Sequence, residues 1–169
     1  AVAREVAVAL ARLHSREIGL GDFTHERIRV GEETLYVLTG DRVHVPTNEM
    51  VHHGASPRGR YQPPEDVDGE LAAVERGDRF ALGVHIYQLL TGGHSPFERS
   101  HGGDSRTLKR HLRSSQSGRL SVRSSEAYTY GELPELTQFH LERCFRDGWD
   151  SPERRPTAEE WVKILTRSF

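Results

Sequence analysis

Six short motifs carry most of the side chains in this chain that could do chemistry. In sequence order they are Leu13-His14-Ser15, Gly21-Asp22-Phe23, Tyr61-Gln62-Pro63-Pro64-Glu65, Asp78-Arg79-Phe80, Pro96-Phe97 and Arg155-Pro156-Thr157. A carboxylate such as Asp22 can accept a proton from a hydroxyl or help to hold a hard cation. An arginine such as Arg155 can pair with a carboxylate or contact a phosphate. No motif is diagnostic alone, so the chemistry depends on how the fold brings these side chains together.

The stretch from Asp78 to Gly93 indicates the element around which the fold is built. It is apolar nearly all the way round and ends at the paired glycines Gly92 and Gly93. A helix without a polar face must be surrounded by other elements. We therefore expect residues 78–91 to form the central helix of a mainly helical domain. Asp78 would begin it, where a carboxylate is favourable.

Shorter patterns predict the elements that precede this helix. Apolar residues at helical spacing indicate a helix over 1–15, which Gly19 and Gly21 would end. It has no capping residue in front, which suggests a chain cut from something longer. Two β-branched and aromatic runs, 28–30 and 34–38, flank a glycine-containing turn and predict a hairpin. Residues 46–70 have the composition of a loop, and 71–77 could form a short helical lead-in.

Three further helices are expected after the central one. One lies near 105–112, within a segment rich in serine and arginine. The next covers 134–146, and its apolar positions are Leu136, Phe139, Leu141 and Phe145. The last covers 157–167, with Thr157 and Glu160 at the spacing of a capping box.

Composition narrows the class of protein. The chain has 169 residues, which is about one domain, with 35% hydrophobic residues and a formal net charge of −2. No apolar run reaches the length of a membrane span, and the first residues do not resemble a signal peptide. The single cysteine, Cys144, excludes an internal disulfide framework, so a cytoplasmic setting fits best. The ten histidines are too scattered to indicate a metal site. Cys144, Trp149 and Trp161 are interpreted as buried packing residues.

In order and rough spacing, the six motifs resemble landmarks of the C-lobe of eukaryotic-type Ser/Thr protein kinases. Residues 80–90, 144–148 and 155–161 are also similar to a bacterial branch of kinase-like proteins, some of which carry helix-hairpin-helix DNA-binding modules. The resemblance covers most of the chain. It implies that residues 1–169 form a mainly α kinase-like C-lobe, a helical bundle around a buried central helix with one small β-hairpin. The N-lobe would be absent from the chain.

The resemblance assigns a catalytic role to Asp22, which matches the carboxylate that accepts the proton of the substrate hydroxyl. The neighbouring residues depart from the family pattern. Leu20 and Gly21 replace His-Arg, and Arg27 replaces the metal-binding Asn. Arg27 cannot ligate magnesium, but it could fill the volume of the missing ion or contact the phosphate of the nucleotide. The structural alternative is that Asp22 only organises a turn after Gly21.

The second metal ligand of the family follows the hairpin as Asp-Phe-Gly, where this chain has Leu38-Thr39-Gly40-Asp41. If Leu38-Thr39-Gly40 is aligned so that Thr39 stands at the position of the magnesium-binding Asp, the site has lost this ligand and would be inactive. A register shifted by two residues allows Asp41 to bind the metal and the nucleotide. Nothing in the chain resembles the glycine-rich loop or the strand lysine of a kinase N-lobe. ATP and magnesium are therefore expected cofactors only if the protein is active.

Three residues receive structural roles from the same resemblance. Glu65 and Arg155 match a pair that forms a buried salt bridge in the family. Asp78 matches a carboxylate that accepts hydrogen bonds from the backbone of the catalytic loop. For Asp78, the alternative reading is a cap on the surface.

The sequence therefore predicts a degenerate kinase or pseudokinase of bacterial signalling that acts by binding a protein partner. One alternative is an active Ser/Thr kinase that transfers phosphate from ATP to a protein substrate once its N-lobe is present. A second alternative is a nucleic-acid-associated module that uses the basic residues of segment 106–123. These are Arg106, Lys109, Arg110, Arg113, Arg119 and Arg123. Because no aromatic residue lies among them, a solvated insert is the preferred interpretation of this segment.

Overall fold

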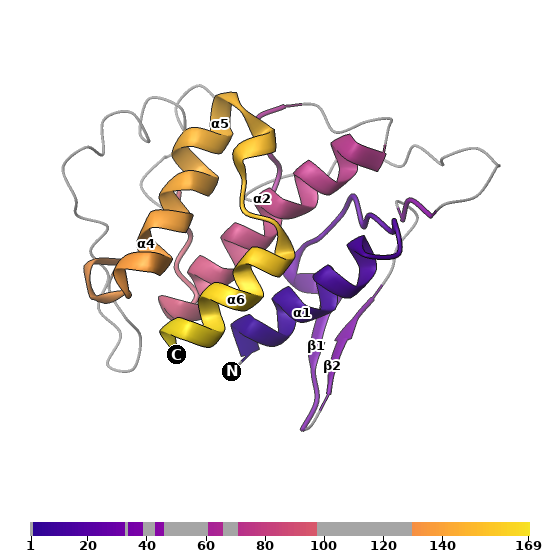
Figure 1. Ribbon diagram of the computed structural model, residues 1–169. Coiled ribbons are helices and arrows are strands. Elements are labelled where there is room, and N and C mark those ends of the chain that lie inside the picture. The colour runs from indigo at the N-terminus through magenta and orange to yellow at the C-terminus, as the bar shows by residue number, and fades with distance from the viewer. Residues whose placement is uncertain (1, 33, 39–42, 46–60, 66–70, 98–129) are drawn as a thin grey trace.

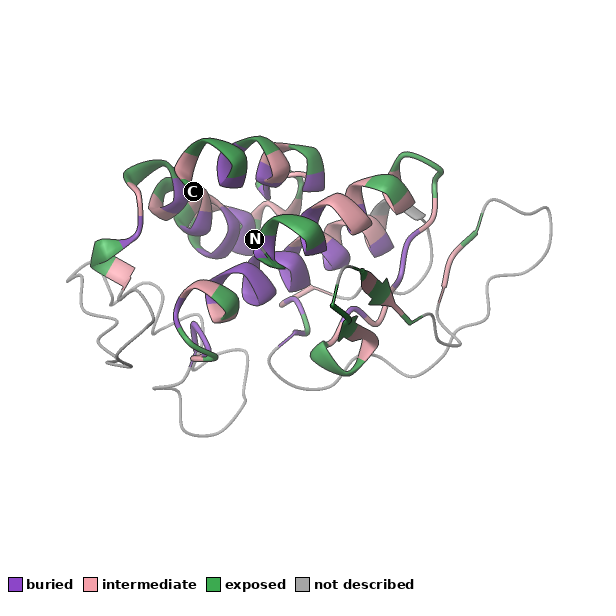
Figure 2. Ribbon diagram, turned by 90° about the horizontal axis from the view of Figure 1, so that it is seen from below, coloured by how far each residue is buried: buried purple, intermediate pink, exposed green. Residues whose placement is uncertain are grey.

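Helix α2 (Leu71–Leu90) is the central element of the fold (Figure 1). The computed structural model describes residues 2–32, 34–38, 43–45, 61–65, 71–97 and 130–169. Within these ranges the chain is mainly helical, with one small two-stranded antiparallel sheet. Every residue from Phe80 to Tyr87 is buried, and Figure 2 shows this helix surrounded by neighbours that are exposed only on their outer sides. The predictions of a mainly α fold and of a helix without a polar face are confirmed.

The start of α2 differs from the prediction. Residues 71–77 are the first two turns of one continuous helix and not a separate lead-in, because most of them are good helix formers and Gly77 does not interrupt it. Asp78 therefore lies inside the helix and not at its start, so its charge is not stabilised by the helix dipole. The predicted end is correct: Gly92 and Gly93 both have positive φ, and the Gly93 N–H donates to the carbonyl of Gln88 at 2.7 Å.

Helix α1 (Val2–His14) packs against α2 and also against the C-terminal helix α6 (Ala158–Ser168). It ends earlier than the glycines suggested. Glu17 adopts a left-handed conformation with φ 58°, and the N–H of Ile18 donates to the carbonyl of Leu13 at 3.0 Å. These features form a Schellman motif, which is usually built on glycine. The helix is therefore ended by Glu17, and the positive φ of Gly21 serves the loop that follows.

The predicted hairpin is present. Strands β1 (Ile28–Val30) and β2 (Leu35–Val37) pair antiparallel, with Arg29 opposite Tyr36, after a short 3₁₀ turn, η1 (His25–Arg27). Ile28 and Val37 are half-buried against the core, whereas Tyr36 is exposed. Alternate residues of a strand point to opposite faces, so one face of the hairpin packs on the helices and the other is open.

The helix predicted over 134–146 is present but continues further. Helix α4 (Glu135–Glu142) follows a 3₁₀ turn, η2 (Tyr130–Glu132), and runs into a π-helical turn, η3 (Arg143–Asp147), and the short α5 (Gly148–Asp150). Of its four predicted apolar positions, Leu141 and Phe145 are buried. Leu136 and Phe139 are exposed instead.

Helix α6 follows the 3₁₀ turn η4 (Pro152–Arg154) and begins with the predicted capping box. The N–H of Glu160 donates to Oγ1 of Thr157, and the N–H of Thr157 donates to Oε2 of Glu160. Trp161 and Trp149 are buried, as expected of packing residues. None of the helices in the described ranges is long and apolar enough to cross a membrane.

Several predictions fall outside the described residues. They concern the helix near 105–112, most of the loop 46–70, Thr39 and Asp41 at the metal position, and the basic residues of segment 106–123.

Close packing at Gly83 yields a stability prediction. A Cβ added there would lie 2.6 Å from Sγ of the buried Cys144, a short side chain that cannot move aside. We expect Gly83→Ala to lower the free energy of unfolding by about 1–2 kcal/mol, since overpacking outweighs the gain in helix propensity. Urea denaturation would measure it. In a Cys144→Ala background the same change should be less destabilising, and an equal loss in both backgrounds would contradict this explanation.

Candidate functional site

Asp78 fixes the loop that carries Asp22. The Asp78 carboxylate, 2% exposed, accepts hydrogen bonds from the backbone N–H of Leu20 at 2.7 Å and of Gly21 at 3.0 Å. Nε2 of His14, at the end of α1, lies 3.2 Å from the same carboxylate. A buried charge is tolerated only when its oxygens are paired, so the interior of α2 holds this loop through its backbone. The loop contact expected of Asp78 is thus present, although Asp78 does not begin the helix.

His85 provides a second anchor on the same helix, two turns further along. Its Nε2 lies 3.1 Å from the carbonyl oxygen of Phe23, and because a carbonyl only accepts, this nitrogen must carry the hydrogen. The imidazole also contacts the Phe23 ring in a T-shaped geometry and stacks on the Tyr61 ring, with centroid distances of 4.7 and 4.6 Å. Burial lowers the pKa of His85 to about 4, so it is neutral near pH 7. The two anchors hold the backbone on both sides of Asp22.

Asp22 lies between these anchors and forms an ion pair with Arg27. Nη2 of Arg27 donates to Oδ2 of Asp22 at 3.0 Å, and both side chains are partly exposed. The structure thus brings together the predicted catalytic residue and one of the two predicted cofactor-binding residues. A carboxylate neutralised by a guanidinium is a poor cation ligand, whereas the outer edge of an arginine suits an anion.

Asp22 alone would not hold magnesium at this loop, because the ion needs further ligands. No group of three or more acidic, histidine or cysteine side chains in the described ranges is placed to hold a metal ion. Magnesium usually takes one or two carboxylates together with phosphate oxygens, and the carboxylate of Asp22 is already paired with Arg27. The predicted metal and nucleotide ligand, Asp41, lies outside the described residues.

Segment 61–65 is attached to the core at both ends. At its start, the hydroxyl of Tyr61 donates to Oε1 of Gln88 at 2.7 Å, and its ring lies 5.7 Å from that of His25. At its end, Glu65 accepts two hydrogen bonds from Arg155, at 2.6 and 2.7 Å. The segment is therefore positioned beside the Asp22 loop by contacts with α2 and with the turn before α6.

Arg155 is fully buried, and its contacts compensate for the cost of burying its charge. Besides the two bonds to Glu65, it donates to the carbonyls of Gly148 and Arg76, and its guanidinium lies 5.1 Å from the centroid of the Phe80 ring. A buried arginine needs such pairing because leaving the charge unpaired is strongly destabilising. The structure thus brings Glu65 and Arg155 into contact, 90 residues apart in sequence.

Sequence reasoning missed His85 as a site residue and interpreted Cys144 as buried. A histidine inside an otherwise apolar helix was the available signal for His85, since a buried imidazole needs a hydrogen-bonding partner. Cys144 is indeed buried, and burial raises the pKa of its thiol to about 12, so it is not a reactive nucleophile.

Comparison with known proteins does not place the chain in a family. No protein-family model matches it, and no curated protein matches it significantly.

The Glu65–Arg155 contact makes a prediction for stability. Arg155→Ala should lower the free energy of unfolding by about 3–5 kcal/mol, because it leaves Glu65 and two carbonyls without their partner. Glu65→Ala should also be destabilising, but less so, since Glu65 is a quarter exposed. In a double-mutant cycle the loss for both changes should be smaller than the sum of the single losses. Strict additivity would count against the pair.

The lowered pKa of His85 predicts a pH dependence. Between pH 6.5 and about 4, the unfolded chain binds a proton on this residue that the folded chain does not. Stability is therefore lost as the pH falls through this window, by about 3 kcal/mol from His85. Urea denaturation at about pH 7 and about pH 4.5 would measure the loss.

His85→Gln is the matched variant, since its amide can still donate to the carbonyl of Phe23 but does not titrate. The loss of stability on acidification should be smaller in this variant than in the wild type. An identical pH dependence in both proteins would mean that His85 is not buried in its neutral form.

Proposed function

We propose that this chain is the C-lobe of a protein-kinase-like domain whose phosphotransfer site is degenerate, and that it acts in signalling by binding a protein partner. The support for the scaffold is spatial. The loop of Asp22 rests on a buried central helix through Asp78, and segment 61–65 is tied to the turn before the last helix through Glu65 and Arg155. These contacts between motifs far apart in the sequence support the proposal of a kinase-like scaffold.

The ion pair between Arg27 and Asp22 is the observation that supports a degenerate phosphotransfer site. A general base must reach the hydroxyl proton of the substrate, and phosphoryl transfer needs metal ions to bridge the phosphates. Here the residue in place of the metal ligand is a cation that binds the candidate base. The same loop can hold its backbone geometry without catalysing the reaction, which favours a role in binding.

Nucleotide binding tests this proposal. The natural protein that contains this sequence should show a change in melting temperature below about 1 °C when ATP and magnesium are added at millimolar concentration, because a ligand that does not bind the folded state does not stabilise it. Asp22→Asn, which keeps the volume of the side chain but removes its charge, is the control and should behave alike. Differential scanning fluorimetry would measure both.

The active-kinase alternative predicts a different result. The natural protein that contains this sequence would then incorporate labelled phosphate from ATP in a magnesium-dependent reaction, and Asp22→Asn would abolish it. Such incorporation, or a rise of several degrees in the melting temperature of this protein with ATP and magnesium, would overturn the degenerate reading.

A further inference from the structure

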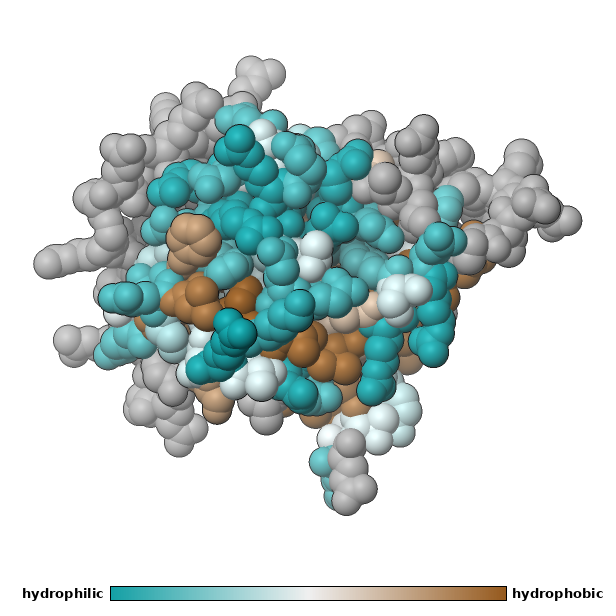
Figure 3. Space-filling model, viewed as in Figure 1, coloured by the Kyte–Doolittle hydropathy of each residue, from teal (hydrophilic) through white to brown (hydrophobic). Residues whose placement is uncertain are grey.

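Helix α4 presents two large apolar side chains to solvent. Leu136 is 40% and Phe139 is 59% exposed, and they lie one turn apart on the same face. The opposite face of α4 is buried through Thr137 and Leu141, so the exposed pair is not needed for the core. Figure 3 shows apolar surface over α4 and α6 beside hydrophilic residues. An exposed apolar patch with a polar rim is typical of an interaction surface.

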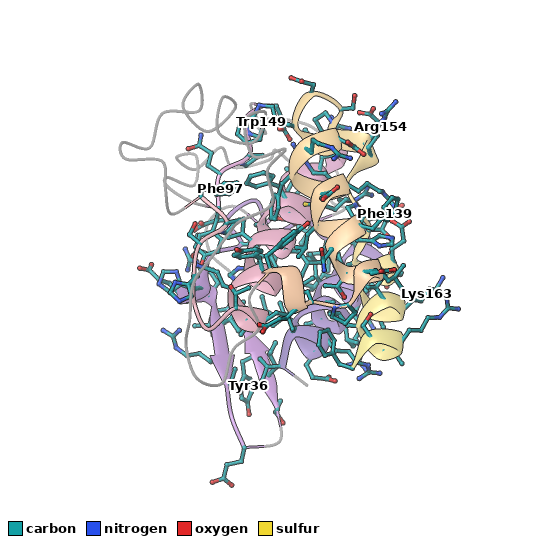
Figure 4. The ribbon with its side chains drawn as sticks, turned by 90° about the vertical axis from the view of Figure 1, so that its left-hand side faces the viewer. Tyr36, Phe97, Phe139, Trp149, Arg154 and Lys163 are labelled. Atoms are coloured by element: carbon teal, nitrogen blue, oxygen red, sulfur yellow. The ribbon has the colours of Figure 1, made fainter. Side chains whose placement is uncertain are left out.

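Charges of opposite sign lie on the two sides of this patch. α4 contacts α6 through His140, whose ring lies 6.0 Å from that of Trp161. His140 therefore marks the side of α4 that faces α6. Around the helix from His140, the exposed Glu135 comes after Phe139, so it lies on the side of Phe139 away from α6. α6 exposes Lys163 and Arg167, one turn apart. Figure 4 shows Phe139 and Lys163 on the same side of the molecule.

These three charges, together with the exposed Glu159 one turn before Lys163, differ from the other charges on the same helices. Arg143 is paired with Glu160, and Arg146 is paired with Glu142. Glu135, Lys163 and Arg167 have no ion-pair partner within the described part of the chain. The face therefore has an acidic edge on α4, an apolar centre and an edge on α6 where Glu159 is followed by the basic Lys163 and Arg167.

From this pattern we infer that the α4–α6 face binds a second copy of the chain. A two-fold axis parallel to the two helices would place α4 of each copy against α6 of the other. The acidic edge of one copy would then meet the basic edge of the other, and both apolar centres would be covered. Because the apolar centre is small, the dimer is a weak one with a dissociation constant in the micromolar range. This inference rests on the proposed function, in which the chain acts by binding a protein, and it identifies that protein as a second copy of the chain.

Sedimentation velocity of the wild-type chain over a range of concentrations, up to roughly 300 µM, tests the inference. We expect association that Phe139→Ser weakens at least about tenfold, since this side chain lies at the centre of the patch. Tyr36→Ser removes a similarly exposed aromatic residue from the hairpin and should leave association unchanged. Thermal unfolding of each variant would establish that it is folded.

Charge reversal gives a sharper test that depends on the symmetry. Glu135→Arg and the double variant Lys163→Glu/Arg167→Glu should each weaken self-association at least about tenfold, because like charges then face each other at both edges. Mixed in equal amounts, the two variants should form a heterodimer with nearly wild-type affinity. In that pair, one edge carries the swapped charges and the other carries the native ones.

A wild-type chain that stays monomeric at the highest concentration would overturn the inference. So would association that Phe139→Ser does not weaken, or a mixture of charge variants that associates no better than its components. These results are independent of nucleotide binding: stabilisation by ATP and magnesium would contradict the degenerate site, whereas loss of self-association would contradict only the choice of partner.

Discussion

The buried carboxylate of Asp78 is the constraint on which the rest of the structure depends. A charge inside an apolar helix is costly unless every oxygen is paired, and the partners of Asp78 are two backbone N–H groups of the loop after α1 and Nε2 of His14 at the end of α1. Satisfying this one carboxylate fixes α1, α2 and the loop relative to one another. Asp22 is then held at a defined, partly exposed position between the buried residues Leu20 and Phe23.

The scaffold and the chemistry of the site are physically separable in this protein. The backbone around Asp22 is held by Asp78 and His85, neither of which needs Asp22 to be charged or free. The ion pair with Arg27 can therefore change what the loop does without changing where it lies. Under the proposed function, this separation lets the loop keep its geometry while the domain acts by binding, and the exposed face of α4 and α6 becomes as relevant as the loop.

Much of the fold could be predicted because it depends on local rules. The apolar run of α2, the glycines that end it, the hairpin and the capping box of Thr157 and Glu160 each follow from residues close together in sequence. Boundaries were less predictable. Glu17 ends α1 in a conformation that favours glycine, so the glycines further along the chain did not mark the end of this helix. α2 begins before Asp78 because most of residues 71–77 are good helix formers.

By itself, the sequence determined the kind of elements, the buried nature of the central helix and the residue types available for chemistry. Only the tertiary structure decided which of them meet. The pairing of Arg27 with Asp22 depends on how the loop turns, and the contact of His85 with the Phe23 carbonyl depends on how that loop lies against α2. The exposure of Phe139 depends on which face of α4 packs against the core. Spacing along the chain shows which face of a helix a residue occupies, but only packing shows what that face meets.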